Sequence, residues 1–253
     1  MSIMEIDNLT LSFGGLKALD DLSFQVDRSE IFSIIGPNGA GKTSLFNCIS
    51  GFYTPDGGAI RFEGKILNGL KPHNITSLGI IRTFQNLRLF RDMTVEENVM
   101  ASLYCRQKSN IVDALLHTRR YKREEKMARE IAQKYLTMVG LHKLSGRLVK
   151  KLPYGVQKRL EIARALAIEP AVIMFDEPAA GLNHEEKEDL MRIIGDIKKM
   201  GITVLLIEHD MGLVMHISER IIVLNYGKKI ADGTPLEIRN NEAVVEAYLG
   251  REQ

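Results

Sequence analysis

The sequence has little cysteine and almost no net charge, and both shortages narrow the class of protein. Its 253 residues include two cysteines, Cys48 and Cys105, which lie far apart and offer neither a disulfide framework nor a metal-ligand spacing. This usage favours a reducing compartment such as the cytosol. The formal net charge of +2 is too close to balance to make nucleic acid or acidic lipid the main partner.

Long hydrophobic runs are also missing. The longest, such as 202–207, fall far short of the roughly 20 residues that a membrane-spanning helix needs, and the N-terminus lacks a signal-peptide core. We therefore expect a soluble protein, with association to a membrane partner left open. With 45% hydrophobic residues the chain can bury a core in one domain that carries a grafted lobe, although two domains are an alternative.

A glycine-rich stretch carries the strongest chemical signal. It reads Gly36-Pro37-Asn38-Gly39-Ala40-Gly41-Lys42-Thr43, with Ser44 next, between an apolar run at 31–35 and a helical pattern at 44–49. Glycines let a loop wrap phosphates with its backbone amides, Lys42 adds a charge near the outer phosphates, and the Thr43 hydroxyl suits Mg²⁺. The GxxxxGK[ST] spacing in a strand and helix context predicts a nucleotide site, and the alternative is a glycine-rich turn.

Hydrophobic periodicity predicts an alternating β and α chain. Strands are expected at 3–13, 22–26, 31–35, 59–62, 171–175 and 202–207, with a hairpin at 220–231. Helices are expected at 94–104, where Thr94 and Glu97 form a capping box, at 121–139, at 158–167, and at 184–200 after Asn183. This order indicates an α/β fold with a mostly parallel sheet. Residues 1–86 and 151–253 would form the core, and about 87–150 an inserted helical lobe.

Basic residues gather at 119–126. They are interleaved with Glu124 and Glu125, so we favour a solvated helix face over the alternative of contact with a membrane surface.

Acidic residues follow the buried strand at 171–175. Open α/β sheets place ligand groups at the carboxyl ends of their strands, so Asp176 is the candidate Mg²⁺ ligand. Glu177 is the candidate general base that polarises the attacking water, while an ordinary turn before Pro178 is the alternative.

Three further positions suit a nucleotide site. Gln85 follows a strand-like run, from which its amide can reach the metal or the attacking water, and His209 follows the strand at 202–207 as a candidate γ-phosphate contact. Phe13 ends the first strand, where it either stacks on adenine or packs internally.

A second anion-binding element precedes the helical run at 158–167. It reads Leu152-Pro153-Tyr154-Gly155-Val156-Gln157. Pro153 suits the first position of a helix, and Gly155 permits close backbone approach at the positive end of that helix.

In this order the motifs resemble those of ABC transporter ATPases over nearly the whole chain. Phe13 matches the adenine-stacking aromatic of that family, and residues 36–43 match its Walker A motif. Gln85 resembles the Q-loop glutamine, and residues 152–156 stand where the signature motif belongs. Asp176 and Glu177 match Walker B with its catalytic base, residues 180–183 resemble the D-loop, and His209 resembles the switch histidine. The sequence that flanks these motifs, and the tail at 233–250, resemble the branched-chain amino acid importer branch of the family. The resemblance implies a P-loop NTPase (RecA-like) fold with an N-terminal antiparallel β part.

The same resemblance implies function and partners. We expect an ATP- and Mg²⁺-dependent hydrolase on the cytoplasmic face of the membrane, bound to permease subunits and a second ATPase, and served indirectly by a substrate-binding protein, with no nucleic acid partner. Two ATPs would be held between two subunits, with Tyr154 and Gly155 facing the partner's nucleotide. The alternatives are a lipid or lipopolysaccharide exporter ATPase, and a soluble clamp on ribosomes or DNA.

The sequence departs from the family at two places. The common signature Leu-Ser-Gly-Gly-Gln has Pro153, Tyr154 and Val156 in place of its serine, first glycine and glutamine, which predicts weak hydrolysis at the site that it completes. Asn183 stands where the D-loop usually has aspartate, although it can still cap the next helix.

Overall fold

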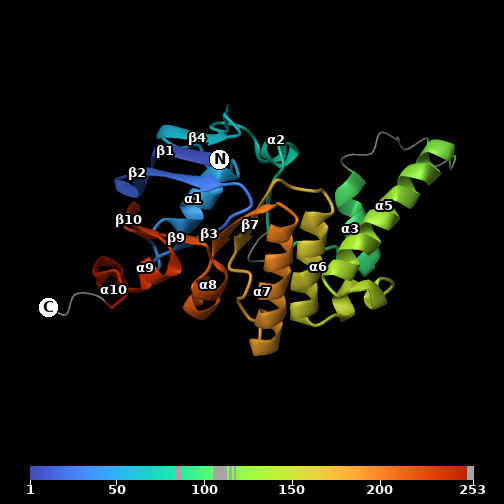
Figure 1. Cartoon of the computed structure of the whole chain (residues 1–253). Coiled ribbons are helices and arrows are strands. Elements are labelled where there is room, and N and C mark those ends of the chain that lie inside the picture. Colours follow the sequence, from blue (N-terminus) through green and yellow to red (C-terminus); the bar gives the residue numbers. More distant parts are fainter. Residues whose placement is uncertain (84–86, 105–112, 114–115, 117, 250–253) are drawn as a thin grey trace. The chain divides into compact units, whose positions relative to one another are not determined.

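The computed structural model describes residues 1–83, 87–104, 113, 116 and 118–249 (Figure 1). These residues form two compact units. Unit 1 comprises Met1–Arg82, Ala171–Ala180 and the chain from Lys187 onward, and unit 2 comprises Thr83–Pro170 and Gly181–Glu186.

Unit 1 begins with a four-stranded antiparallel sheet. Its strands lie in the order β2-β1-β4-β5 and span Ser2–Phe13 (β1), Leu16–Asp27 (β2), Gly57–Phe62 (β4) and Lys65–Ile66 (β5). The expected strand at 22–26 was too short, because β2 already begins at Leu16. Register shifts where β1 pairs with the first half of β2 interrupt the strict alternation on which the prediction relied.

The second sheet of unit 1 is the mostly parallel one. Its strand order is β10-β9-β3-β8-β7-β6, and only the β9–β10 pair is antiparallel. The strands span Ile31–Ile35 (β3), Ile80–Arg82 (β6), Val172–Asp176 (β7), Thr203–Ile207 (β8), Arg220–Asn225 (β9) and Lys228–Gly233 (β10). Every residue of β3, β7 and β8 is buried, as expected for parallel strands covered on both faces.

Helices connect most strands of unit 1, and two more follow the last strand. They span Lys42–Ile49 (α1), Pro72–Ser77 (α2), Met211–Ile217 (α8), Pro235–Arg239 (α9) and Glu242–Leu249 (α10), together with most of α7 (His184–Lys199). The apolar side of α7 is buried as its periodicity predicts. The short helices α2, α8, α9 and α10 escaped prediction because they have too few turns to establish a helical period.

Unit 2 is helical. Its main helices span Val95–Leu103 (α3), Arg119–Met138 (α5) and Tyr154–Leu166 (α6), and all three pack against one another. The predicted capping box at the start of α3 is present, with reciprocal bonds between Thr94 and Glu97. Because α6 packs with α3 and α5, the unit extends to Pro170, beyond the boundary near residue 150 expected from the sequence.

The fold class predicted from the sequence is confirmed, with a parallel core sheet, an antiparallel N-terminal sheet and an inserted helical unit. Within the described part of the chain, no helix has both the length and the apolar character required to cross a membrane.

Candidate active site

The phosphate loop joins β3 to α1 in a shape that depends on its three glycines. Gly36 has φ +147° and Gly41 has φ +105°. A Cβ at Gly36 would lie 2.1 Å from the Leu224 carbonyl oxygen, and one at Gly41 would lie 2.4 Å from that of Ala18. Gly39, with φ +79°, faces open space instead. The loop therefore needs glycine at 36 and 41 to pack against its own chain, and at 39 to turn.

Lys42 is the one charged residue of this loop. It is the first residue of α1, which begins two residues earlier than the helical pattern predicted. Its Nζ donates hydrogen bonds to the carbonyl oxygens of Gly36 (2.6 Å) and Pro37 (2.9 Å). Burial lowers the pKa of the Lys42 ammonium, and the negative charges of Glu177 and Asp176 oppose that shift. The loop thus holds a buried cation whose partners are its own carbonyl groups and two nearby carboxylates.

A pocket of about 370 Å³ opens over this loop. It is lined by Phe13, Leu16, Lys17, Ala18, Asn38, Gly39, Ala40, Gly41, Lys42, Thr43, Ser44, Glu177 and Tyr226. The pocket thus joins the end of β1, the phosphate loop and the residue after β7. Gly36 and Pro37, which the sequence also assigned to nucleotide binding, lie outside this lining. Phe13 is 47% exposed and contacts the Tyr53 ring edge-on at 5.2 Å, so much of its ring remains open to a ligand.

Asp176 ends β7 in a buried ion pair that the sequence did not indicate. Its Oδ2 accepts a hydrogen bond from Arg82 Nη2 at 2.7 Å, and both side chains are about nine-tenths buried. Arg82 Nη1 also donates to Asn47 Oδ1 (2.7 Å) and to Ser50 Oγ (3.1 Å) on the α1 side. The guanidinium therefore links β6, β7 and α1. An arginine at the end of a short apolar strand was the signal that could have revealed it.

Glu177 and His209 meet at the ends of neighbouring strands. β7 and β8 are parallel and in register from Val172 opposite Thr203 to Asp176 opposite Ile207. His209 Nδ1 therefore lies 3.8 Å from Glu177 Oε2, and its side chain is 64% exposed. Glu177 has φ +48°, a left-handed conformation that costs energy for any residue other than glycine. Such strain is commonly retained where a side chain must be aimed at a site.

The C-terminal helix supports the phosphate loop from another side. A second pocket, of about 510 Å³, lies between loop residues 37–40 and α10, which contributes Ala243, Glu246 and Ala247. Burial raises the pKa of the Tyr248 hydroxyl, and a hydrogen bond with the Gly36 backbone opposes that shift. None of the predicted site residues lies in this helix.

The signature segment lies in unit 2. Pro153 occupies the N-cap position of α6 rather than the first helical position, so Tyr154 and Gly155 open the helix. A Cβ at Gly155 would lie 2.1 Å from Glu186 Oε1, and one at Gly181 would lie 3.2 Å from the Tyr154 ring. Close approach at Gly155 thus serves internal packing between α6 and the start of α7.

Asn183 caps α7 as predicted. Its backbone N–H donates to Glu186 Oε2 at 3.0 Å, and its Oδ1 accepts from the Glu186 N–H at 2.9 Å. The remaining predicted residue, Gln85, lies outside the described residues. Unit 1 therefore brings together Phe13, most of the phosphate loop, Asp176, Glu177 and His209, while the signature belongs to unit 2.

The donors near the phosphate loop suit a hard cation that is only partly held by protein. Thr43 and Asp176 offer hydroxyl and carboxylate oxygens, the ligand type that Mg²⁺ prefers. Among the described residues no cluster of three or more His, Cys, Asp or Glu side chains forms a complete metal cage.

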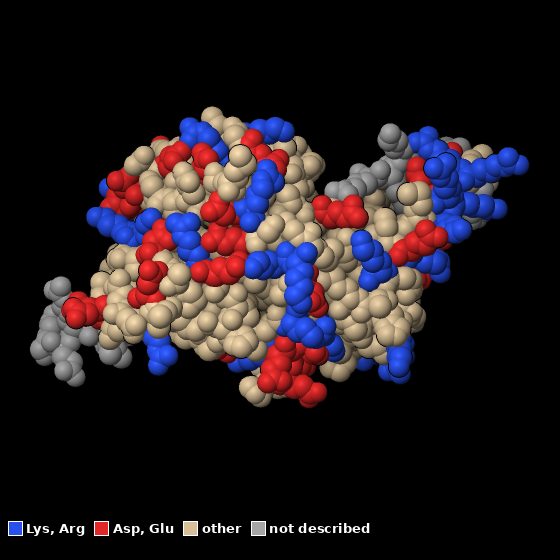
Figure 2. Space-filling model, in the orientation of Figure 1, with Lys and Arg blue, Asp and Glu red and all other residues tan. Residues whose placement is uncertain are grey.

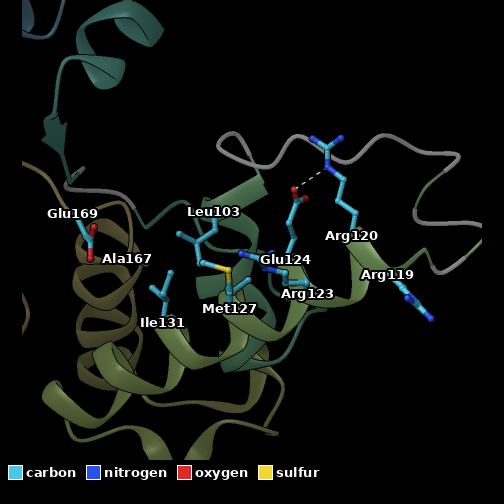
Figure 3. Close-up of a pocket in the computed structure, with 10 residues that line it drawn as sticks. Leu103, Arg119, Arg120, Arg123, Glu124, Met127, Ile131, Ala167 and Glu169 are labelled. Carbon is cyan, nitrogen blue, oxygen red and sulfur yellow. Dashed lines mark hydrogen bonds and ion pairs between the residues drawn. The ribbon is translucent and has the colours of Figure 1, made fainter.

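The largest of these pockets lies in unit 2. It measures about 620 Å³, with an apolar floor from Leu103, Met127 and Ile131 and basic residues of α5 at its rim (Figure 3). None of the described residues assigned to nucleotide chemistry lines it. The smaller pocket over the phosphate loop is therefore the candidate active site.

The basic cluster predicted at 119–126 lies at the first turns of α5 (Figure 2). Its arginines and lysines are exposed. Arg120 pairs with Glu124 at 3.4 Å, and Lys126 with Glu130 at 3.8 Å, each one helical turn apart. These pairs are typical of a solvated helix face.

Comparison with known proteins places the chain in a family. The family model described as "ABC transporter" matches residues 19–180, and that of the "Branched-chain amino acid ATP-binding cassette transporter" matches 228–253. The chain is 47% identical to the high-affinity branched-chain amino acid transport ATP-binding protein BraF of Pseudomonas aeruginosa, over 98% of both chains.

Solved structures agree. The crystal structure of the ADP conformation of MJ1267, an ATP-binding cassette of an ABC transporter, is 34% identical with a TM-score of 0.86, over 99% of this chain and 100% of that one. A dimeric post-hydrolysis cassette, MJ0796 with ADP and Pi, is 26% identical with a TM-score of 0.76, over 92% of this chain and 98% of that one. The chain therefore belongs to the ABC transporter family, among its ATP-binding and ATP-hydrolysing subunits.

Proposed function

We propose that this chain is the energy-coupling ATPase of an importer for branched-chain amino acids. The observation that carries the ATPase site is the pocket in which the phosphate loop, Lys42 and Glu177 converge. The cargo is supported by the 47% identity with BraF and by the match at residues 228–253. These two similarities favour an importer over an exporter of lipid or lipopolysaccharide.

The proposed chemistry uses the residues of unit 1 in separate roles. Loop amides and Lys42 would bind the phosphates, and Phe13 would stack on the adenine. Glu177 would accept a proton from the attacking water, and His209, at 3.8 Å from it, would contact the γ-phosphate. The Gln85 amide would contact either the metal ion or the attacking water.

Thr43 and Asp176 would hold Mg²⁺, which when bound neutralises charge that develops on the phosphates. The Arg82 guanidinium already occupies Asp176 Oδ2, which fixes the orientation of this carboxylate. The other carboxylate oxygen then points in a defined direction.

We further propose that two such subunits sandwich two ATPs, with units 1 and 2 acting together as one ATPase domain. Tyr154 and Gly155 would face the partner's nucleotide. ATP would act as a ligand with higher affinity for the closed dimer, and hydrolysis would remove that preference. Permease subunits at the cytoplasmic face of the membrane would convert closure into transport, so the chain would be peripheral and would not bind nucleic acid.

Two variants test the site. Lys42→Ala removes the loop's only charged side chain at the phosphates, so tight ATP binding should be lost. Glu177→Gln keeps the shape but removes the base, so binding should persist while hydrolysis nearly stops. Equilibrium binding of a fluorescent ATP analogue and steady-state phosphate release measure the two effects. Wild-type turnover by the Glu177→Gln protein in the assembled transporter would show that another group is the base.

The cargo is tested separately, in cells that lack this protein. Uptake of radiolabelled leucine, isoleucine and valine should return with the wild-type chain and not with Glu177→Gln, while uptake of an unrelated amino acid should be unchanged. Co-purified permeases and a second ATPase should accompany the chain. Normal uptake of all three amino acids in the deletion strain would exclude this cargo.

A further inference from the structure

Glu208 is next to the proposed γ-phosphate contact in the chain and hydrogen-bonds near the proposed base, yet the function above gives it no role. It follows β8 directly and precedes His209. Its side chain has no exposed surface, although it carries a carboxyl group. A buried carboxyl group is costly unless hydrogen bonds satisfy it.

Three backbone N–H groups satisfy this side chain. Glu208 Oε1 accepts a hydrogen bond from Ala179 at 2.7 Å. Oε2 accepts from His209 at 3.0 Å and from Asp210 at 3.3 Å. The first donor belongs to the segment after β7 and the other two to the segment after β8. One side chain therefore joins the two segments that carry Glu177 and His209.

This bridge begins where the backbone ladder stops. β7 and β8 pair in register up to Asp176 opposite Ile207, and one further bond runs from the Glu177 N–H to the Ile207 carbonyl at 2.9 Å. Beyond that point the Glu208 side chain supplies the connection that backbone pairing supplied before. The loops at this edge of the sheet are thus tied together by a side chain.

The segment held in this way is strained. Glu177 has φ +48°, and its carbonyl accepts a bond from the Ala180 N–H at 3.2 Å. A left-handed conformation at such a residue persists only when the surrounding contacts impose it. The Glu208 bond to Ala179 lies two residues from the strained position and is one of these contacts. Loss of that bond would let Glu177 relax and change the direction of its side chain.

We propose that Glu208 is a positioning residue. It clamps the Glu177 segment to the His209 segment and so keeps the proposed base and the proposed γ-phosphate contact at a fixed distance from each other. This inference rests on the proposed function of Glu177 and His209. Glu208 itself touches neither nucleotide nor water in the reaction. Its effect is on the 3.8 Å approach of His209 Nδ1 to Glu177 Oε2.

The substitution Glu208→Gln tests the clamp in the full chain. The amide keeps the size of the side chain but replaces one acceptor oxygen with an NH₂ group, which must face at least one backbone N–H. Turnover should fall by up to about 100-fold, which is the loss that a misplacement of about 1 Å can cause. Binding of the fluorescent ATP analogue should stay close to wild type, because the phosphate loop is unchanged.

Hydrogen–deuterium exchange supplies a readout that a local structural role would not move. In the variant, exchange should rise together in peptides covering 176–181 and 207–212, although only the second contains the substitution. The matched control is Glu219→Gln. Glu219 Oε2 also accepts from a backbone N–H, that of Ile31 at 3.2 Å, but at the amino ends of β3 and β9, the opposite end of the strands. Unlike Glu208, Glu219 is partly exposed, and its Oε1 pairs with Lys198. This control should leave turnover and both peptides unchanged.

Wild-type turnover of Glu208→Gln, or a rise in exchange confined to 207–212, would overturn the proposal. If that variant does not fold, Glu208→Asp is measured in the same way, since it keeps the charge but shortens the reach to Ala179. Wild-type turnover by this second variant would equally refute the clamp. The turnover of the Glu177→Gln protein tests the proposed function separately. Full activity of that variant would show that Glu177 is not the base, whatever the result for Glu208.

Discussion

Removal of Arg82 should destabilise unit 1 more than the loss of any exposed ion pair. The Arg82 and Asp176 side chains are 7% and 11% exposed, and Arg82 also bonds Asn47 and Ser50. Arg82→Met therefore leaves the Asp176 charge buried without its cation. Breaking one side of a buried pair typically costs about 3–5 kcal/mol of unfolding free energy. Arg82→Lys should fall between the wild type and Arg82→Met, because it keeps the charge and loses the planar fork.

The measurement is urea unfolding followed by circular dichroism, without nucleotide or Mg²⁺. Arg61→Met is the matched control, since Arg61 pairs with Asp7 on the N-terminal sheet while both side chains are more than one-third exposed. Its expected cost is about 0–1 kcal/mol. The double variant Arg82→Met with Asp176→Asn neutralises the orphaned charge, so the two changes should be non-additive by about 0.5–3 kcal/mol. Additivity, or an Arg82→Met cost equal to that of Arg61→Met, would refute a structural role for this pair.

Three further predictions concern assembly, the signature and a thiol. Without ATP the chain should be a monomer or weak dimer, and ATP should stabilise a dimer of the Glu177→Gln variant. Light scattering measures the molar mass, and a mass that does not change with nucleotide, even with the permease and the partner ATPase present, would contradict the ATP sandwich. Combining Pro153→Ser, Tyr154→Gly and Val156→Gln should raise the turnover of the isolated chain, because each restored charge-assisted hydrogen bond is worth about 1.5–3 kcal/mol, and no increase would remove the case for a weakened signature. Cys48 is 3% exposed, and burial raises the pKa of its thiol to about 12. In a Cys105→Ser variant, iodoacetamide at pH 8 should therefore label Cys48 only after the protein unfolds. Rapid labelling of the folded protein, measured by mass spectrometry, would contradict this prediction.

Features that depend on neighbours in the chain were accessible from the sequence alone. The capping boxes at Thr94 and Asn183 require only a side chain and an amide three residues away, and both form as predicted. The buried strands β3, β7 and β8 are apolar except for Ser33, Asp176 and Thr203, and such nearly continuous apolar runs predict a parallel sheet covered on both faces. The motif order gave the family, and the comparisons confirmed it.

Only the tertiary structure decided how the site is supported. Arg82 reaches Asp176 across 94 residues of sequence, and Glu208 reaches Ala179 across 29. Nothing in the sequence near either residue specifies such a partner, because the pairing depends on which strands lie side by side and in which register. Gly155 illustrates the same limit, since its missing side chain is explained by Glu186 of another helix. Local chemistry determined which groups the site contains, and strand order and register determined which groups hold them in place.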